Sequence, residues 1–88
     1  MKVNDQVIYR CIAGEHILIP VGSVALMQNG LYVLNEVSAL IWTMLSEGKS
    51  ENEIISKIAE TYDAPEDTIR ADYLELTEEL CRIGLLFN

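Results

Sequence analysis

Basic side chains are scarce in this sequence, which has 6 Lys and Arg residues against 14 Asp and Glu residues and a formal net charge of −8. The basic residues are scattered along the chain and form no run. Proteins that bind nucleic acids usually carry a basic face that neutralises phosphates, and anionic membranes attract the same kind of surface. The charge balance therefore argues against a nucleic acid or a membrane as partner and favours a neutral or basic peptide.

Metal ligands and thiols are equally few, because the chain has one His and two Cys residues. Cys11 and Cys81 lie far apart without a CxxC pattern, and no CxxxCxxC triplet is present, so neither a structural zinc site nor a radical-SAM iron–sulfur cluster is expected. We expect both thiols to be small core residues in a reducing cytosol, with a disulfide between them as the alternative. For His16, which lies in an apolar strand pattern, we expect a ring that faces solvent or is hydrogen-bonded at the sheet.

Signals of catalysis are missing too. No Gly-rich loop of the kind that cradles phosphates occurs, and no convergent acid, base and nucleophile can be drawn from these residues. A core built from 88 residues also leaves little room for a deep cleft. The sequence therefore predicts a protein that is not an enzyme, with no cofactor and no metal.

Long apolar runs are also absent. No stretch approaches the roughly 20 residues of a membrane-spanning helix, and the first residues, MKVNDQVIYR, lack the apolar h-region of a signal peptide. We therefore expect a soluble, cytoplasmic protein. Since half of the residues are hydrophobic, the chain supports one core and a single domain over 1–88.

The first third of the chain has the composition of strands. Residues 1–34 are rich in β-branched and aromatic residues broken by Gly, which predicts short strands over 7–12, 16–19 and 31–34. Turn signals separate them: Ala13-Gly14-Glu15 after the first strand, Pro20 at the end of the second, and Asn29-Gly30 before the third. Residues 24–27 are ambiguous between a strand extension and a crossover.

The remainder has helical spacing with clear caps. Asn35 and Gly48 bracket a first helix over about 36–46. Its apolar face is Val37, Leu40, Ile41, Met44 and Leu45, with Trp42 on the flank. Ser50 and Glu53 match the S-x-x-E capping box of a second helix. The apolar face of that helix is Ile54, Ile55, Ile58, Ala59 and Tyr62.

A third helix is predicted to begin with Pro65 in its first turn and to be capped by Gly84. Its apolar stripe is Ile69, Tyr73, Leu76, Leu80 and Ile83, and Leu85-Leu86-Phe87 follows as an apolar tail with strand character. Three strands followed by three helices predict an α+β fold. We expect a winged helix-turn-helix in which a three-stranded antiparallel N-terminal wing precedes the helices.

Carboxylates are concentrated on the predicted third helix. They are Glu66, Asp67, Asp72, Glu75, Glu78 and Glu79, against Arg70 and Arg82. Such a helix is unsuited to the DNA major groove that the last helix of a helix-turn-helix usually enters. Either the acids form a solvated face, or they form an acidic rim that receives a basic peptide residue. Asp72 is the leading candidate for the second role, because it neighbours the apolar stripe.

Several segments carry a family resemblance. The most specific is residues 30–36, GLYVLNE, followed by Ala39-Leu40-Ile41-Trp42; the others are residues 14–22, GEHILIPVG, and Leu45, Gly48, Ser50, Glu53-Ile54, Tyr62, Asp72 and Gly84-Leu85-Leu86. Together they cover nearly the whole chain. They resemble the PqqD family, named for the coenzyme PQQ synthesis protein D, whose members are also called precursor-peptide recognition elements.

The resemblance implies a non-catalytic protein that binds the leader of a ribosomally made precursor peptide and presents it to a modifying enzyme, often a radical-SAM protein. It implies that the leader adds as a strand to the third strand of the wing, beside the third helix. Carried onto this chain, the peptide-binding residues are Leu31, Tyr32, Val33, Leu34, Ile69, Asp72, Tyr73 and Leu76. The hydroxyls of Tyr32 and Tyr73 are expected to be open to a ligand or water, and Leu40, Ile41 and Trp42 to be core beneath the site.

Two other functions stay open from the sequence. The chain could be an assembly subunit of a larger enzyme that binds a folded partner, or a winged-helix regulator that binds DNA, which the charge distribution opposes. An exposed wing edge also allows a homodimer in which the edge pairs with its copy.

Overall fold

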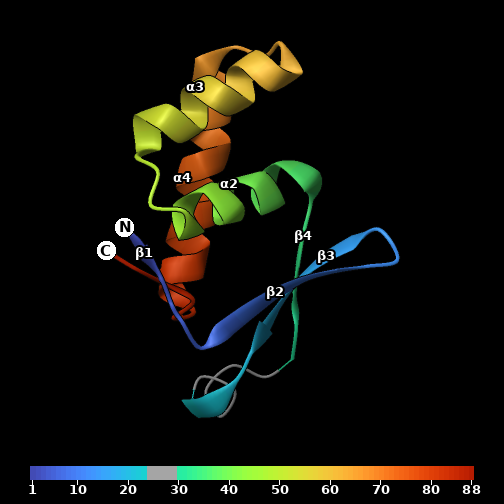
Figure 1. Cartoon of the computed structure of the whole chain (residues 1–88). Coiled ribbons are helices and arrows are strands. Elements are labelled where there is room, and N and C mark those ends of the chain that lie inside the picture. The colour runs from blue at the N-terminus through green and yellow to red at the C-terminus, as the bar shows by residue number, and fades with distance from the viewer. Residues whose placement is uncertain (24–29) are drawn as a thin grey trace.

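A computed structural model describes residues 1–23 and 30–88 of the chain, and Figure 1 shows its architecture. Within these residues a three-stranded antiparallel sheet precedes three helices, which is the predicted α+β order. The sheet consists of β2 (Val7–Ile12), β3 (Glu15–Pro20) and β4 (Tyr32–Leu34), and the helices are α2 (Glu36–Ser46), α3 (Glu51–Tyr62) and α4 (Glu66–Arg82). None of these helices is long and apolar enough to cross a membrane.

The sheet follows the predicted strands closely, in the order β2-β3-β4. β2 has the predicted bounds, β3 is one residue longer at each end, and β4 begins at Tyr32 rather than Leu31. Ala13 and Gly14 alone form the first turn, with φ angles of 51° and 81°. A two-residue hairpin turn needs positive φ at both positions, which explains the glycine. The predicted ambiguous segment 24–27 and Asn29 lie outside the described residues.

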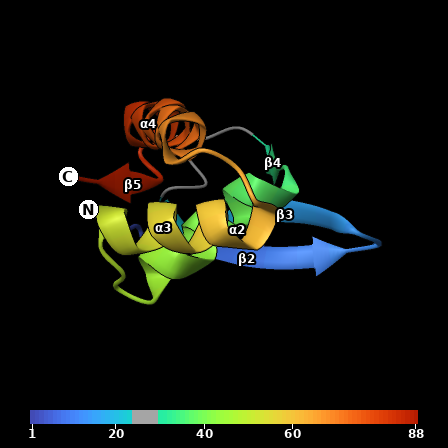
Figure 2. The same cartoon turned by 90° about the horizontal axis from the view of Figure 1, so that it is seen from above.

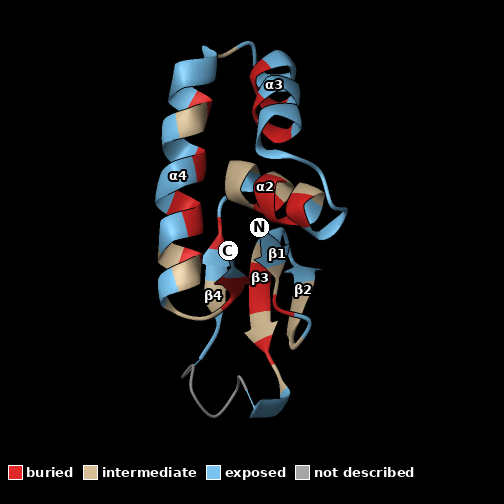
Figure 3. Cartoon of the chain, turned by 90° about the vertical axis from the view of Figure 1, so that its left-hand side faces the viewer, coloured by how far each residue is buried: buried red, intermediate tan, exposed pale blue. Residues whose placement is uncertain are grey.

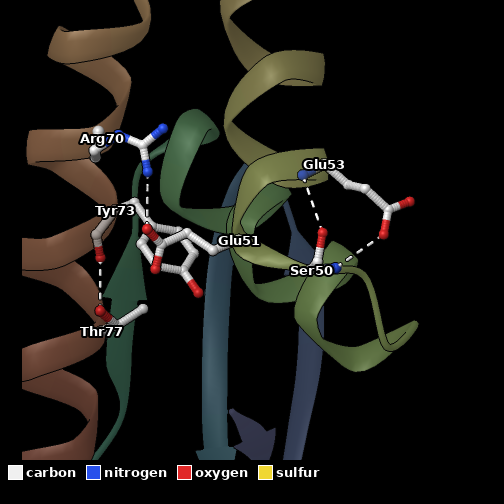
Figure 4. Close-up of polar contacts among 6 residues, drawn as sticks. All are labelled: Ser50, Glu51, Glu53, Arg70, Tyr73 and Thr77. Atoms are coloured by element: carbon white, nitrogen blue, oxygen red, sulfur yellow. Dashed lines mark hydrogen bonds and ion pairs between the residues drawn. The ribbon is translucent and has the colours of Figure 1, made fainter.

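The helix caps confirm the predicted boundaries. The Asn35 side chain accepts a hydrogen bond from the Ser38 backbone N–H before α2. Ser50 and Glu53 form both bonds of the capping box at α3, as Figure 4 shows. Pro65 stands at the N-cap of α4 rather than inside its first turn.

The hydrophobic core lies between the sheet and the three helices. Figure 3 shows that the buried stripe of α4 faces the other two helices. Trp42 and Ile41 of α2 are buried as expected, together with Leu18 of β3 and Leu34 of β4. Tyr62 does not belong to this core, contrary to the prediction. It lies at the end of α3, is 37% exposed, and its hydroxyl donates to the Glu36 carboxylate at 2.7 Å.

A second, two-stranded sheet joins the two ends of the described chain. β1 (Lys2–Val3) pairs antiparallel with β5 (Leu86–Phe87), and the termini lie close together in Figure 1. Leu85 and Leu86 are buried, so the apolar tail completes the core. The strand character of the tail was predicted, whereas β1 was not, because two residues carry no measurable periodicity.

The cysteines depart from the expected packing. Cys11 is exposed, because the β2–β3 hairpin extends beyond the helices, as Figure 1 shows, and its tip has no layer above it. Cys81 is half-buried and packs against the core from α4. Both are free thiols, so the alternative of a disulfide between them is also wrong.

Candidate functional site

The alternation of hydrogen-bonded and non-hydrogen-bonded residue pairs between β2 and β3 fixes the direction in which each backbone N–H and C=O points. Val21 donates its backbone N–H to the Gln6 carbonyl at 2.8 Å, just beyond the Val7 and Pro20 pair. Opposite residues in antiparallel strands alternate between hydrogen-bonded and non-hydrogen-bonded pairs. Counting along the register from Gln6, the Arg10 and Ile17 pair is therefore hydrogen-bonded. The backbone groups of Ile17 thus point to β2.

The same alternation sets the direction of the backbone groups of β4. Since Ile17 points to β2, its neighbours His16 and Leu18 point their N–H and C=O groups to β4, where they lie opposite Leu34 and Tyr32. Val33, which lies opposite Ile17, therefore points its N–H and C=O away from β3. Among the described strands, none pairs with β4 on that side. The backbone of Val33 accordingly forms an open sheet edge.

The side chains of β4 alternate between two faces. Leu34 is buried and Tyr32 half-buried, and both lie against the helices. Leu31 and Val33 are 59% and 61% exposed on the outer face. A strand that paired with this edge would follow the same alternation, with every second side chain turned toward the helices.

A groove of about 630 Å³ lies along this edge, between β4 and α4. Figures 2 and 3 both show β4 beside α4. The strand side of the groove is Tyr32, Val33 and Leu34, and the start of α2 adds Asn35, Val37 and Ser38. The α4 side is Asp72, Glu75, Leu76, Glu78, Glu79 and Arg82. The groove therefore combines an open backbone edge, an apolar floor and an acidic wall.

Charged side chains on the α4 side of the groove change the pKa of the Tyr32 hydroxyl. Burial raises the pKa of the Tyr32 hydroxyl, Glu79 raises it further, Arg82 opposes this effect and Glu75 adds to it. Arg82 donates from Nη2 to the Glu79 carboxylate, and this hydrogen bond raises the pKa of Arg82. The Tyr32 hydroxyl thus stays neutral and lies within the field of the C-terminal half of α4.

The structure brings together five of the predicted site residues and separates three. Tyr32, Val33, Leu34, Asp72 and Leu76 line the groove. Leu31 is exposed just before β4 and is not part of the lining.

Ile69 and Tyr73 lie in the core, 3% and 2% exposed, and do not line the groove. In Figure 4 the Tyr73 ring extends from α4 toward the start of α3. Its pKa is raised by burial first, then by Glu51 and Cys81, and its ring packs in the core instead of facing the groove. The physical reason is that the apolar stripe of α4 packs onto the other helices, while the adjacent polar stripe faces β4.

Sequence analysis included Glu75, Glu78 and Glu79 only in the alternative of an acidic rim with Asp72 as its leading candidate, and it did not place Arg82 in the site. Glu75 and Glu79 follow Asp72 by three and seven positions, so helical periodicity puts them on the same face. That signal was present in the sequence. The contribution of Val37 and Ser38 had no such signal, because it depends on how the start of α2 follows β4.

His16 is engaged elsewhere, as expected for a histidine bonded at the sheet. The Tyr9 hydroxyl lies 2.6 Å from His16 Nδ1, and the two rings stack with centroids 6.0 Å apart. Within residues 1–23 and 30–88, no three or more His, Cys, Asp and Glu side chains are grouped so that they could hold a metal ion. What the groove offers chemically is therefore hydrogen bonds along a strand edge, apolar contact and negative charge.

The sequence and the fold are similar to those of known proteins. A solved structure described as "TbiB1 in Complex with the TbiA(beta) Leader Peptide" is 28% identical, covers 98% of this chain and 94% of its own, and has a TM-score of 0.81. A comparison with curated proteins gives no match. The family model described as coenzyme PQQ synthesis protein D (PqqD) matches residues 15–86. Because that match covers most of the sequence, the chain belongs to the PqqD family.

Proposed function

We propose that this protein is a non-catalytic module that binds the leader of a ribosomally made precursor peptide and presents it to a separate modifying enzyme, such as a radical-SAM protein. The observation that carries the proposal is the open backbone edge at Val33 beside the groove along α4. The similarity to TbiB1, whose structure contains a leader peptide, supports it over 98% of the chain.

Strand addition suits this edge physically. An extended peptide that pairs with a sheet edge gains main-chain hydrogen bonds whatever its sequence, and pockets for alternate side chains add specificity. Here the main-chain donor and acceptor are those of Val33, and Leu31 would continue the same edge. Side chains turned inward would meet Leu34, Val37 and Leu76.

The proposed contact residues are Tyr32, Val33, Leu34, Asp72 and Leu76, with Leu31 extending the edge. Ile69 and Tyr73 would act indirectly, because their burial fixes α4 and so the opposite wall. Tyr32 would bridge the two walls, since its ring comes from β4 and its hydroxyl lies in the field of Glu79 and Arg82.

The test is a titration of isotopically labelled protein with the leader of a small open reading frame found beside the gene, followed by backbone amide shifts. Saturable shifts confined to residues 31–38 and 72–82 would support leader binding in the groove. If no leader shifts these amides while the modifying enzyme still binds the protein, the proposal fails and the chain acts as an assembly subunit.

A further inference from the structure

We propose that the groove selects peptide strands whose α4-facing side chains are basic, so that the preferred leader carries Lys or Arg at alternate positions. This inference rests on the proposed function, because it concerns the ligand of the same groove. The groove itself is defined by the open edge and by its shape, and the charges of its wall decide which strand it prefers.

The negative charge of the wall is not balanced within the described chain. Asp72, Glu75, Glu78 and Glu79 line the groove against a single cation, Arg82, which is already paired with Glu79. Among the described residues, Asp72, Glu75 and Glu78 have no ion-pair partner. Like charges three and four positions apart destabilise a helix. A ligand cation would relieve this repulsion.

None of the other five basic residues lines the groove. Arg70 pairs with Glu51 at 2.9 Å, on the side of α4 that meets α3 in Figure 4. Lys49 and Lys57 line a different hollow, between α2 and α3. Arg10 lies on β2 and donates to the Tyr9 carbonyl. These side chains therefore leave the acidic wall open for a cation from outside.

The groove also suits the shape of Lys and Arg. These side chains bury an aliphatic stem against apolar surface while the charged head stays hydrated or paired. Leu34, Val37 and Leu76 provide the apolar surface, and Asp72 and Glu75 stand at its rim. An acidic side chain would meet like charges in the same place, and a purely apolar one would leave the carboxylates without a partner.

The register specifies which peptide residues face the wall. The residue opposite Val33 shares its outward face, so the residues on either side of it, opposite Tyr32 and Leu34, turn toward α4. In Figure 1 β4 rises toward α2 while α4 descends. Because the two elements run in opposite directions, the Leu34 end of β4 lies toward the Asp72 end of α4, and Tyr32 lies toward Glu75, Glu79 and Arg82.

The spacing of the two elements agrees with this pattern. Side chains two residues apart on a strand are separated by about 6.8 Å, and residues four apart on a helix rise by about 6 Å. Two inward side chains of a peptide strand therefore match two successive turns of α4. The position beside Leu34 would lie nearest Asp72, and Glu75 lies one turn farther along; among the described residues neither has an ion-pair partner.

The test compares two synthetic peptides, one alternating Thr and Arg and one alternating Thr and citrulline. Citrulline keeps the shape of Arg and removes its charge. We expect the Arg peptide to bind at least roughly five-fold more tightly at low salt, as expected for one or two exposed ion pairs. The difference should shrink in 1 M salt, where the Debye length is only about 3 Å.

A pair of double variants locates the effect on the protein. D72N with E75Q should lower affinity for the Arg peptide roughly five-fold and change citrulline-peptide affinity less than about two-fold. D67N with E60Q makes the same change of charge outside the groove and should leave both affinities unchanged. Neither pair removes a side chain from the core, since all four residues are exposed.

The outcomes separate the two proposals. Charge selection would be overturned if the two synthetic peptides bind with equal affinity. It would also be overturned if neither binds while the leader of the neighbouring reading frame shifts the amides of residues 31–38 and 72–82. Both outcomes would leave leader binding intact. Equal losses from the groove variant and the outer variant would overturn charge selection as well. Failure of all three peptides to shift the groove would overturn leader binding itself.

Discussion

Asn4 donates a hydrogen bond from Nδ2 to the carbonyl of Gly84 at 2.9 Å, and this contact ties the start of the chain to the end of α4. The Asn4 side chain is buried, and its Oδ1 accepts the Gln6 backbone N–H at 2.9 Å. The Asn4 backbone N–H donates to Leu85 at 3.0 Å. One residue thus fixes the segment between β1 and β2 and the segment between α4 and β5.

Replacing Asn4 with Ala should therefore destabilise the fold clearly. The change removes both hydrogen bonds of the Asn4 side chain, to the Gly84 carbonyl and from the Gln6 N–H, and each contributes about 0.5–1.5 kcal/mol. Urea unfolding followed by circular dichroism measures the loss. Asp5→Ala, at the exposed neighbour, is the control and should change the free energy of unfolding by less than about 0.5 kcal/mol. Equal stability of the two variants would contradict the role of Asn4.

The capping box of α3 predicts a second effect, on both stability and its pH dependence. Ser50→Ala removes the acceptor of the Glu53 N–H and should cost about 1 kcal/mol at neutral pH. The pKa of Glu53 is lowered from 4.5, first by the hydrogen bond from the Ser50 backbone N–H. A lowered folded-state pKa stabilises the fold above the unfolded pKa, and this stabilisation is lost as the pH falls through the folded value.

Glu53→Gln tests directly whether the stabilisation from Glu53 is lost as the pH falls. The variant should lose the part of the acid destabilisation that begins below about pH 4.5, because a neutral amide cannot be protonated over this range. Urea midpoints measured between pH 3 and pH 7 for the wild type and the variant would show it. Ser56→Ala, on the exposed side of α3, serves as the control for helix propensity. An unchanged pH profile in the Gln variant would contradict the role of Glu53.

Variants at core and groove positions of α4 should differ in their effects on stability and on leader affinity. Ile69→Ala opens a cavity in the core and should cost about 2–5 kcal/mol of stability. Because Ile69 does not line the groove, leader affinity measured well below the unfolding temperature should stay within about two-fold. Leu76→Ala, which changes both the core and the groove floor, should lower stability and affinity together. A large affinity loss in the Ile69 variant, with the fold intact, would place that side chain in the binding site.

The fold was readable from the sequence because its signals are local. Asn35, the Ser50 and Glu53 pair, and the glycine at 14 each act within a few residues, so the strand and helix bounds they predict are close to those observed. β1 has no such signal, since it is held by its pairing with β5 at the other end of the chain.

The site was readable only in part, because it depends on rotation between elements. Val33 and Asp72 could be placed on one strand edge and one helix, yet the sequence alone does not say which stripe of α4 faces the strand. The predicted stripe through Ile69 and Tyr73 turns to the core, and the next stripe, through Asp72 and Glu75, faces β4. Each step of 100° around a helix changes a residue's surroundings completely.

The assignment of the open edge predicts opposite results for proline at neighbouring positions of β4. Val33→Pro removes an N–H that points to the groove, and Pro is tolerated on an edge strand in that orientation. The variant should fold with a loss of no more than about 1 kcal/mol and should bind a leader at least roughly ten-fold more weakly. Val33→Ala keeps the N–H and is the matched control. Calorimetric titration and thermal unfolding measure the two quantities.

Tyr32→Pro, in contrast, should destabilise the fold strongly. Its N–H points to β3 opposite Leu18, so proline there breaks a bond inside the sheet and should cost about 3 kcal/mol or more. If Val33→Pro unfolds the protein and Tyr32→Pro does not, the backbone of Val33 bonds to β3, and Tyr32 presents the open edge instead. If both fold and both bind a leader normally, β4 is not the strand to which the peptide adds. Only a stable Val33→Pro protein that has lost leader affinity agrees with strand addition at this edge.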